Sequence, residues 1–310
     1  MNIYISGSMA YDRIMDFPGR FSDHILPDKI HILNVSFTVN GMIEKFGGTA
    51  GNVAYSLSLL NEKPIILATI GKDYANYFEW LKKIGVSVEG IKIIENEFTA
   101  GAYITTDRAD NQITGFNPGA MKYPSGYNFN SASPRDSIAL IAPGNLQDMA
   151  EYAKECKKRG IRYICDPGQS LTAWQKESLK EWIEGSTMLI SNDYELEMAM
   201  KMTGMNKKEL LQLTQTIITT LGEKGSLIST GESDIQIPPA KAGDVVDPTG
   251  AGDAFRAGLL KGIAMGKGLE TGAKMGAVAA VYAIEKYGTQ EHCFSYDDFS
   301  QRYRSNFGEM

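Results

Sequence analysis

Residues 247–258 read Asp-Pro-Thr-Gly-Ala-Gly-Asp-Ala-Phe-Arg-Ala-Gly and combine residue types that could bind an anion and accept a proton. Pro248 disfavours a helix at the residue before it and suits a first helical turn. Gly250 and Gly252 lack a Cβ, so the backbone there can come close to a ligand. An apolar run that predicts a helix follows. The free N–H groups at its start would attract an anion beside Asp253.

Asp253 has a second interpretation, because an aspartate at the start of a helix is often only a cap. The glycines on either side of Ala251 contribute nothing to a cap and lower helix stability. They are expected if a phosphoryl group lies against the backbone while a carboxylate contacts the incoming hydroxyl, as phosphoryl transfer requires. The segment therefore favours phosphoryl transfer over capping.

Composition and motifs exclude several classes of protein. Hydrophobic residues make up 43% of the 310 residues and charged residues 22%, as in an ordinary globular enzyme. The net charge of −6 gives no general attraction to nucleic acid or to an anionic membrane. The sequence G-x-x-x-x-G-K-[ST] is absent and no G-x-G-x-x-G opens a helix, which disfavours P-loop enzymes and nucleotide-dependent dehydrogenases.

The cysteines and the hydropathy pattern indicate a cytoplasmic protein. Cys156, Cys165 and Cys293 form no C-x-x-C pair, so we expect neither a disulfide framework nor a zinc site. The N-terminus lacks the basic region of a signal peptide. The longest apolar stretch, residues 277–284, is far shorter than the roughly 20 residues that span a bilayer.

The elements that must position the site follow an alternating pattern from about residue 62 onward. Short apolar runs predict the strands Ile65–Ile70, Ser137–Ala142, Arg162–Cys165, Met188–Ser191, Ile217–Thr220 and Ser226–Ser229. Amphipathic segments between them predict the helices Tyr74–Ile84, Leu146–Arg159, Lys176–Glu184 and Tyr194–Met202. This alternation predicts an α/β fold with a mostly parallel sheet covered by helices on both faces. After Pro248 we expect helices at Thr249–Met265, Leu269–Tyr287 and Tyr296–Tyr303, the first two rich in the Gly and Ala that allow close packing.

Two segments lack room for helices. Residues 11–46 contain the strand candidates Ile32–Phe37 and Val39–Ile43, and residues 98–116 contain Gly101–Thr106 and Gln112–Phe116 around a polar turn. Both read as strands joined by turns, which suggests a small separate sheet that serves as a lid. An extension of the central sheet is the alternative. We expect a large domain of residues 1–10, 47–97 and 117–310, and a discontinuous lid of residues 11–46 and 98–116.

Two segments in the expected order resemble the signatures of the PfkB carbohydrate and nucleoside kinases. Residues 247–260 are similar to the C-terminal signature, and residues 47–54, Gly-Gly-Thr-Ala-Gly-Asn-Val-Ala, to the N-terminal one, with Gly71 at its far end. Asn61 departs from the Gly or Ser of that pattern. The resemblance covers nearly the whole chain and implies a ribokinase-like fold with a β-lid.

The resemblance also implies roles for single residues. Asp253 is similar to the catalytic base, and the N–H groups of Gly250, Ala251 and Gly252 to the anion hole that stabilises the transferring phosphoryl group. Asn192 and Glu195 match the family's N-x-x-E motif, which implies that they organise Mg²⁺ and phosphate, largely through water. The residues themselves are equally consistent with a helix N-cap.

The same resemblance implies ATP as the phosphoryl donor. Residues 220–225 are similar to the turn that holds the ATP phosphates and ribose, with Thr220, Gly222 and Gly225 in contact; read alone, this turn is a hairpin loop. Asp247 and Thr249 are similar to positions associated with K⁺, which implies a monovalent cation site.

For the acceptor, residues 6–12, 17–21, 116–121 and 288–291 together are similar to the bacterial-type adenosine kinases. That likeness implies that sugar hydroxyls contact Asp12, Gly48 and Asn52, with Ser8 in the same site; a carboxylate and an amide suit vicinal hydroxyls.

An apolar slot is needed for the nucleoside base. Phe37 and Phe116 lie on the predicted lid segments and could stack on it, although core packing is the alternative for each. Ser36 and Gln169 could hydrogen-bond the base edge. Ala102 stands where some adenosine kinases have an aromatic residue, and the neighbouring Tyr103 is aromatic.

We therefore expect an ATP-dependent adenosine kinase. The alternatives are a PfkB kinase for another nucleoside or for a free sugar, and a nucleoside-binding protein without turnover. A small-molecule nucleoside is the expected partner, with no nucleic acid and no membrane. An exposed lid edge could also pair with a second copy to form a homodimer.

Overall fold

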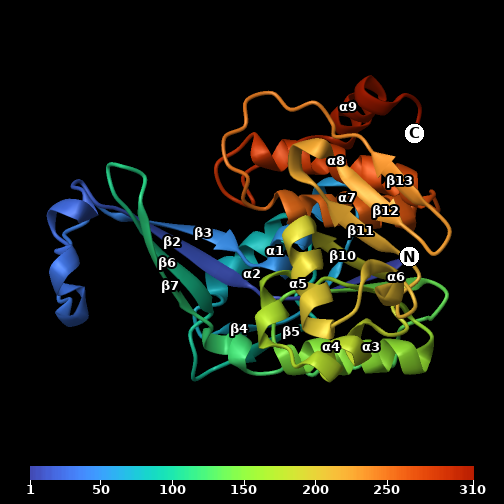
Figure 1. Ribbon diagram of the computed structural model, residues 1–310, viewed down its shortest axis with the longest axis horizontal. Helices are drawn as coiled ribbons and strands as arrows, with labels where there is room; N and C mark the ends of the chain where they lie inside the picture. Colours follow the sequence, from blue (N-terminus) through green and yellow to red (C-terminus); the bar gives the residue numbers. More distant parts are fainter.

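The computed structural model describes residues 1–310, the side chain of Lys29 excepted. Its described residues form a large sheet of nine strands in the order β13-β12-β11-β10-β9-β8-β1-β4-β5 (Figure 1). In that order the strands are Asp234–Ile237, Ser226–Ser229, Ile217–Thr220, Met188–Asn192, Arg162–Cys165, Ser137–Ile141, Asn2–Ser6, Ile65–Gly71 and Ile91–Ile94. Neighbours from β11 to β5 pair in parallel, whereas β12 and β13 are antiparallel.

Helices cover both faces of this sheet because its strands are apolar on both sides. In β1, Ile3 and Ile5 join one core and Tyr4 joins the other. The first core is closed by α1 (Thr49–Leu59), α2 (Ala75–Lys83), α7 (Ala251–Ala264), α8 (Leu269–Ile284) and α9 (Tyr296–Phe307). The second is closed by α3 (Leu146–Arg159), α4 (Lys176–Ile183), α5 (Asp193–Thr203) and α6 (Lys207–Leu210).

Small residues let α7 and α8 lie almost in contact. A Cβ at Gly258 would collide with the backbone carbonyl of Met275, and a Cβ at Gly262 would lie 2.5 Å from the Cα of Gly272. The predicted close packing of these two helices is confirmed. Among the described residues, no helix combines the length and the apolarity that crossing a bilayer requires.

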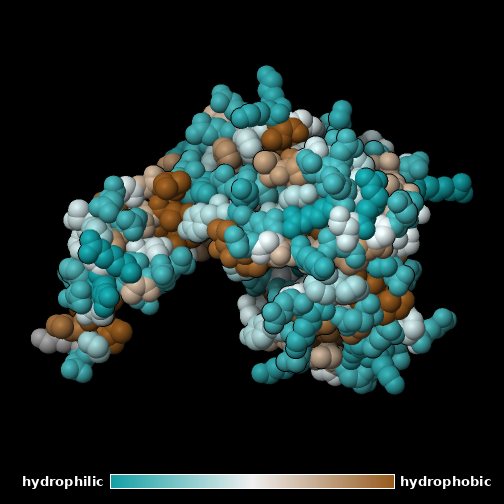
Figure 2. All heavy atoms as spheres, turned by 90° about the horizontal axis from the view of Figure 1, so that it is seen from above, coloured by the Kyte–Doolittle hydropathy of each residue, from teal (hydrophilic) through white to brown (hydrophobic). Residues whose placement is uncertain are grey.

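A second, separate sheet confirms the predicted lid (Figure 1). Its strand order is β3-β2-β6-β7, with bounds Met42–Gly47, Ala10–Asp16, Ala100–Thr106 and Gln112–Asn117. Strands β2 and β6 are parallel and the other pairs antiparallel. In the space-filling view it extends away from the α/β body and leaves a concave space beside it (Figure 2).

Part of the lid prediction was wrong. Ile32–Phe37 is not a strand, and residues 27–32 form a 3₁₀ helix; of Val39–Ile43 only Met42 and Ile43 are in a strand, at the start of β3. The helix has Pro at its start, which suits a first turn and cannot donate to a ladder. Ile32 and Leu33 stay largely exposed, so no neighbouring surface rewards their β-propensity. Strand β2 was not predicted, because its Asp and Arg residues interrupt the alternation of apolar and polar residues that marks a strand.

Candidate active site

A cavity of about 670 Å³ opens at the carboxyl ends of the parallel strands, beside the lid. Residues at or within two positions of the ends of these strands line it: Ser8 after β1, Pro143 after β8, Asp166 after β9, Asn192 at the end of β10 and Thr220 at the end of β11. Strand β1 lies between β8 and β4, so the chain changes direction across the sheet at this point. Open α/β sheets bind ligands at such a switch point.

Two helices aim their N-termini into the cavity. The N-cap of α7 is Gly250 with φ 80°, and that of α1 is Gly48 with φ 88°, both in the left-handed region that favours glycine. Neither N-cap glycine has a side chain that could cap its helix; at α1 the Thr49 N–H donates to Ser8 Oγ at 3.0 Å, and no side chain accepts from the first turn of α7. Among the described residues, the backbone N–H groups of Gly252 and Asp253 have no hydrogen-bond acceptor, whereas that of Ala251 donates to the Pro248 carbonyl. The first turn of α7 is therefore ready to bind an anion.

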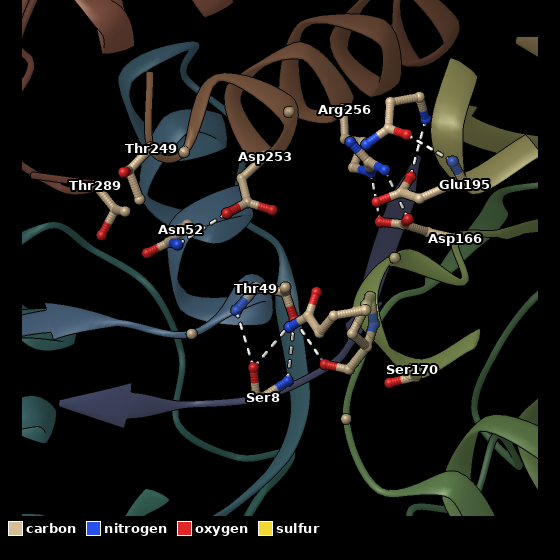
Figure 3. A pocket seen from close by; sticks show the side chains of 18 of the residues that line it. Ser8, Thr49, Asn52, Asp166, Ser170, Glu195, Thr249, Asp253, Arg256 and Thr289 are labelled. Atoms are coloured by element: carbon tan, nitrogen blue, oxygen red, sulfur yellow. Dashed lines mark hydrogen bonds and ion pairs between the residues drawn. The ribbon is translucent and has the colours of Figure 1, made fainter. Parts of the chain in front are cut away.

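Asp253 lies in that first turn and faces α1. Its Oδ2 accepts a hydrogen bond from Asn52 Nδ2 at 2.8 Å (Figure 3). Burial raises the pKa of Asp253 to about 6, and the charges of Asp166 and Glu195 add to the rise, while Arg256 and the Asn52 bond oppose it. A carboxylate with a pKa near 6 is still ionised at neutral pH and is basic enough to accept a proton in a transition state.

A chain of hydrogen bonds orients Asn52. Gln290 Nε2 donates to Asn52 Oδ1 at 3.1 Å, which turns the Asn52 amide nitrogen toward Asp253. Gln290 is itself fixed, because its Oε1 accepts from Trp80 Nε1 at 2.8 Å and its Nε2 also donates to the Tyr77 hydroxyl at 2.9 Å. The sequence offered Gln290 only as part of residues 288–291, without a role.

An ion pair beneath Asp253 was not predicted. Arg256, one turn further along α7, donates from Nη2 to Asp166 Oδ1 at 2.6 Å, and both side chains are buried (Figure 3). The available signals were the position of Arg256 inside the glycine-rich motif and that of Asp166 directly after a predicted strand. Neither signal pairs the two residues, which are 90 positions apart.

The residues predicted for ATP and Mg²⁺ reach the cavity with one exception. Asn192 and Glu195 form a capping box on α5, with Asn192 Oδ1 accepting from the Glu195 N–H at 2.7 Å and Glu195 Oε2 accepting from the Asn192 N–H at 2.9 Å. Both also line the cavity, together with Thr220 and Gly222. Gly225 does not; it lies in the turn between the antiparallel strands β11 and β12, so the hairpin interpretation of this loop is correct.

The donor set fits a magnesium ion held mostly by water and phosphate. In the described part of the chain, no three His, Cys, Asp or Glu side chains form a metal cluster. Glu195 keeps one carboxylate oxygen outside the capping box. Mg²⁺ commonly binds through one or two carboxylates and completes its shell with water and substrate phosphates.

Of Asp247 and Thr249, the residues predicted for K⁺, one lines the cavity and the other does not. Thr249 lines the cavity. Asp247 does not, and its carboxylate accepts backbone N–H bonds from Thr249 at 2.9 Å and Gly288 at 3.0 Å. The cation site stays a prediction.

On the acceptor side, six predicted residues line the cavity: Ser8, Asp12, Gly48, Asn52, Phe116 and Gln169. Asp12 pairs across the lid with Ala102, which pairs with Phe116, so the three share one face of the lid sheet. The small side chain of Ala102 lies at the register position between Asp12 and Phe116. Tyr103 points to the other face, where its hydroxyl accepts from Arg13 Nη1 at 3.1 Å.

The structure does not bring Ser36 and Phe37 to this cavity. Phe37 packs in a cluster at the far end of the lid, with ring centroids 4.8 Å from Phe17 and 5.1 Å from Phe21, and Ser36 is exposed nearby. The reason is local, because residues 33–39 form no strand and do not continue the face that carries Asp12. The packing alternative is correct for Phe37.

The comparisons with known proteins agree with this geometry. The lidded α/β fold and the site at its strand ends define a ribokinase-like protein, as in Methanocaldococcus jannaschii nucleoside kinase, an archaeal member of the ribokinase family, whose crystal structure has a TM-score of 0.87 over 99% of both chains at 32% identity. The family model of the pfkB family carbohydrate kinases matches residues 9–295. The chain belongs to this family.

Three other comparisons also cover most of each chain. The sequence of the Methanocaldococcus jannaschii nucleoside kinase is 34% identical over 271 residues, 87% of this chain and 89% of that protein. Burkholderia thailandensis nucleoside kinase in complex with inosine is 36% identical, with a TM-score of 0.86 over 99% of this chain and 98% of that one. Its complex with ADP-inosine has a TM-score of 0.84 at 37% identity, over 99% and 96% of the chains.

Proposed function

We propose that this protein transfers the γ-phosphoryl group of ATP to the 5′-hydroxyl of a nucleoside, and that adenosine is its acceptor. The products are ADP and AMP, so the reaction returns a purine nucleoside to the nucleotide pool. The observation that carries the proposal is the Asp253 carboxylate, bonded to Asn52 at 2.8 Å and lying beside the unpaired N–H groups at the start of α7.

This arrangement supplies a base and an anion site within one helical turn. The 5′-hydroxyl gives its proton to Asp253 as its oxygen attacks phosphorus, and the Gly252 and Asp253 N–H groups stabilise negative charge on the phosphoryl oxygens. Phosphoryl transfer needs little more than such positioning and charge stabilisation. Mg²⁺, when bound, neutralises phosphate charge, and Glu195 is the residue that would hold it.

The cavity residues on the acceptor side support a substrate that joins a ribose to a flat apolar base. Asp12 and Asn52 offer an acceptor and an amide to vicinal hydroxyls, and Phe116 presents a half-exposed ring on the same face of the lid as Asp12. Gln169 can both donate to and accept from a base edge. Its amide would therefore pair with the 6-amino group of adenosine or the 6-oxo group of inosine.

Inosine is the second candidate acceptor, because the similar Burkholderia thailandensis enzyme is described in complex with inosine. Release of ADP from Mg-ATP, measured with adenosine, inosine, other nucleosides, ribose and fructose, separates the candidates. We expect the highest kcat/KM with adenosine. Turnover restricted to ribose or fructose would contradict a nucleoside site, and no turnover with any acceptor would favour a binding protein.

A further inference from the structure

Arg256 is a cation inside the cavity that the mechanism above leaves without a role. It lies on α7 one turn beyond Asp253, and its side chain lines the cavity although the residue is only 7% exposed. Removing a guanidinium from water is costly unless it is paired. Its surroundings therefore show what it can do.

One edge of the guanidinium is held by Asp166. Arg256 Nη2 donates to Asp166 Oδ1 at 2.6 Å, and Nε forms an ion pair with Oδ2. Asp166 follows β9 and is 2% exposed, so its carboxylate is fixed by the sheet. A planar guanidinium held along one edge has little freedom to turn.

The third nitrogen is free and faces the anion site. In the described part of the chain, Nη1 of Arg256 has no hydrogen-bond acceptor. It lies so close to the first turn of α7 that a Cβ at Gly252 would be 2.8 Å away. Gly252 thus leaves room for the guanidinium, and Nη1 lies next to the backbone that carries the unpaired N–H groups.

An anionic ligand in this cavity could find a side-chain cation only in Arg256. Arg256 is the only basic residue among the described residues that line the cavity, whereas Asp12, Asp166, Asp193, Glu195 and Asp253 are acidic. In Figure 3 the Arg256 side chain is drawn between those of Asp253, the base, and Glu195, the proposed magnesium-binding carboxylate. A polyphosphate bound there meets no other side-chain cation of the cavity wall.

We propose that Nη1 of Arg256 contacts the phosphoryl group as it is transferred, and that Asp166 is the positioning residue that aims it. The inference rests on the proposed function. As the bond from the 5′-oxygen to the γ-phosphorus forms, the bond from that phosphorus to the β-bridging oxygen breaks and ADP leaves with the electron pair. The hydroxyl proton goes to Asp253. Arg256 keeps its protons and stabilises charge, as an arginine supplied within the same chain can do.

The test compares the double variant Arg256→Gln/Asp166→Asn, which leaves no unpaired buried charge, with Lys261→Gln/Glu62→Gln. Lys261 lies on the same helix as Arg256 and is bonded to Glu62 at 2.6 Å, and neither residue of this control pair lines the cavity. We expect the first variant to lose about 10²–10³-fold in kcat, with KM for adenosine changed less than threefold. The control should stay within threefold of wild type in both.

If a folded Arg256→Gln/Asp166→Asn protein keeps a kcat within threefold of wild type, the role of Arg256 is overturned and the proposed function is not affected. Absence of nucleoside-dependent ADP release by the wild-type protein overturns the proposed function, and this inference with it. If the variant does not fold, a crystal structure of the wild type with ADP, Mg²⁺, fluoroaluminate and adenosine decides. Nη1 within about 3.2 Å of a fluoride ligand supports the role, and Nη1 turned away from it contradicts it.

Discussion

Asn52 and Asp253 stand 201 positions apart in the chain and are joined by a hydrogen bond of 2.8 Å between the first turns of α1 and α7. These two helices pack against each other, and the glycine N-cap of each has a positive φ. The bond therefore links the two sequence signatures, one of which supplies the base and the other the amide that fixes it.

The pKa of Asp253 predicts the pH dependence of catalysis. Burial raises this pKa to about 6, and the base acts only when ionised. We expect kcat/KM for adenosine to fall about tenfold per pH unit below pH 6 and to level off above pH 7, because it reports the free enzyme's base. A profile that is flat from pH 5 to pH 8 would contradict a base with this pKa.

Gln290→Glu tests how Asn52 is oriented. A carboxylate can still accept from Trp80 but cannot donate to Asn52 Oδ1, so the amide should turn and present its oxygen to Asp253. Losing a hydrogen bond to an ionised group and adding a nearby negative charge should move the kcat/KM profile up by about one pH unit. The titration of ATP itself affects both profiles equally, so a difference between the wild-type and variant profiles comes from the protein. Superimposed profiles would exclude this positioning role.

Phe116→Ala should raise KM for adenosine about 5–100-fold, because a stacked base is worth roughly 1–3 kcal/mol. The ring is 55% exposed, so its loss should leave the thermal unfolding temperature nearly unchanged. Ile113→Ala is the matched control, since Ile113 is also exposed on β7 but on the opposite face. Equal KM values for the two variants would remove Phe116 from the acceptor site.

Much of the fold could be predicted from the sequence because burial leaves a local pattern. The strands Arg162–Cys165, Ile217–Thr220 and Ser226–Ser229 and the helix Leu146–Arg159 have the predicted bounds, residue for residue. Prediction failed in the lid, where residues 32–37 have a strand-like mix of apolar and polar residues yet lie on no sheet. Strand formation there depends on a partner that the local sequence does not reveal.

Some residues of the candidate site could also be predicted from the local sequence, and others could not. Asp253 and its glycines could be found because the conflict between a helix start and two glycines is visible in one segment. Gln290 and Asp166 could not, because their roles exist only through Asn52 and Arg256, which are 238 and 90 positions away. Ser36 and Phe37 were assigned to the base slot on the assumption of a strand that does not form.

The most direct test of the account is ADP release from Mg-ATP and adenosine by Asp253→Asn. The variant keeps the shape of the side chain, and we expect it to bind adenosine and to unfold at no lower a temperature than wild type at pH 8. The reason is that the raised pKa makes the ionised carboxylate unfavourable in the fold above pH 6. The account predicts a kcat lower by about 10²–10⁴-fold. A kcat within threefold of wild type would contradict Asp253 as the base.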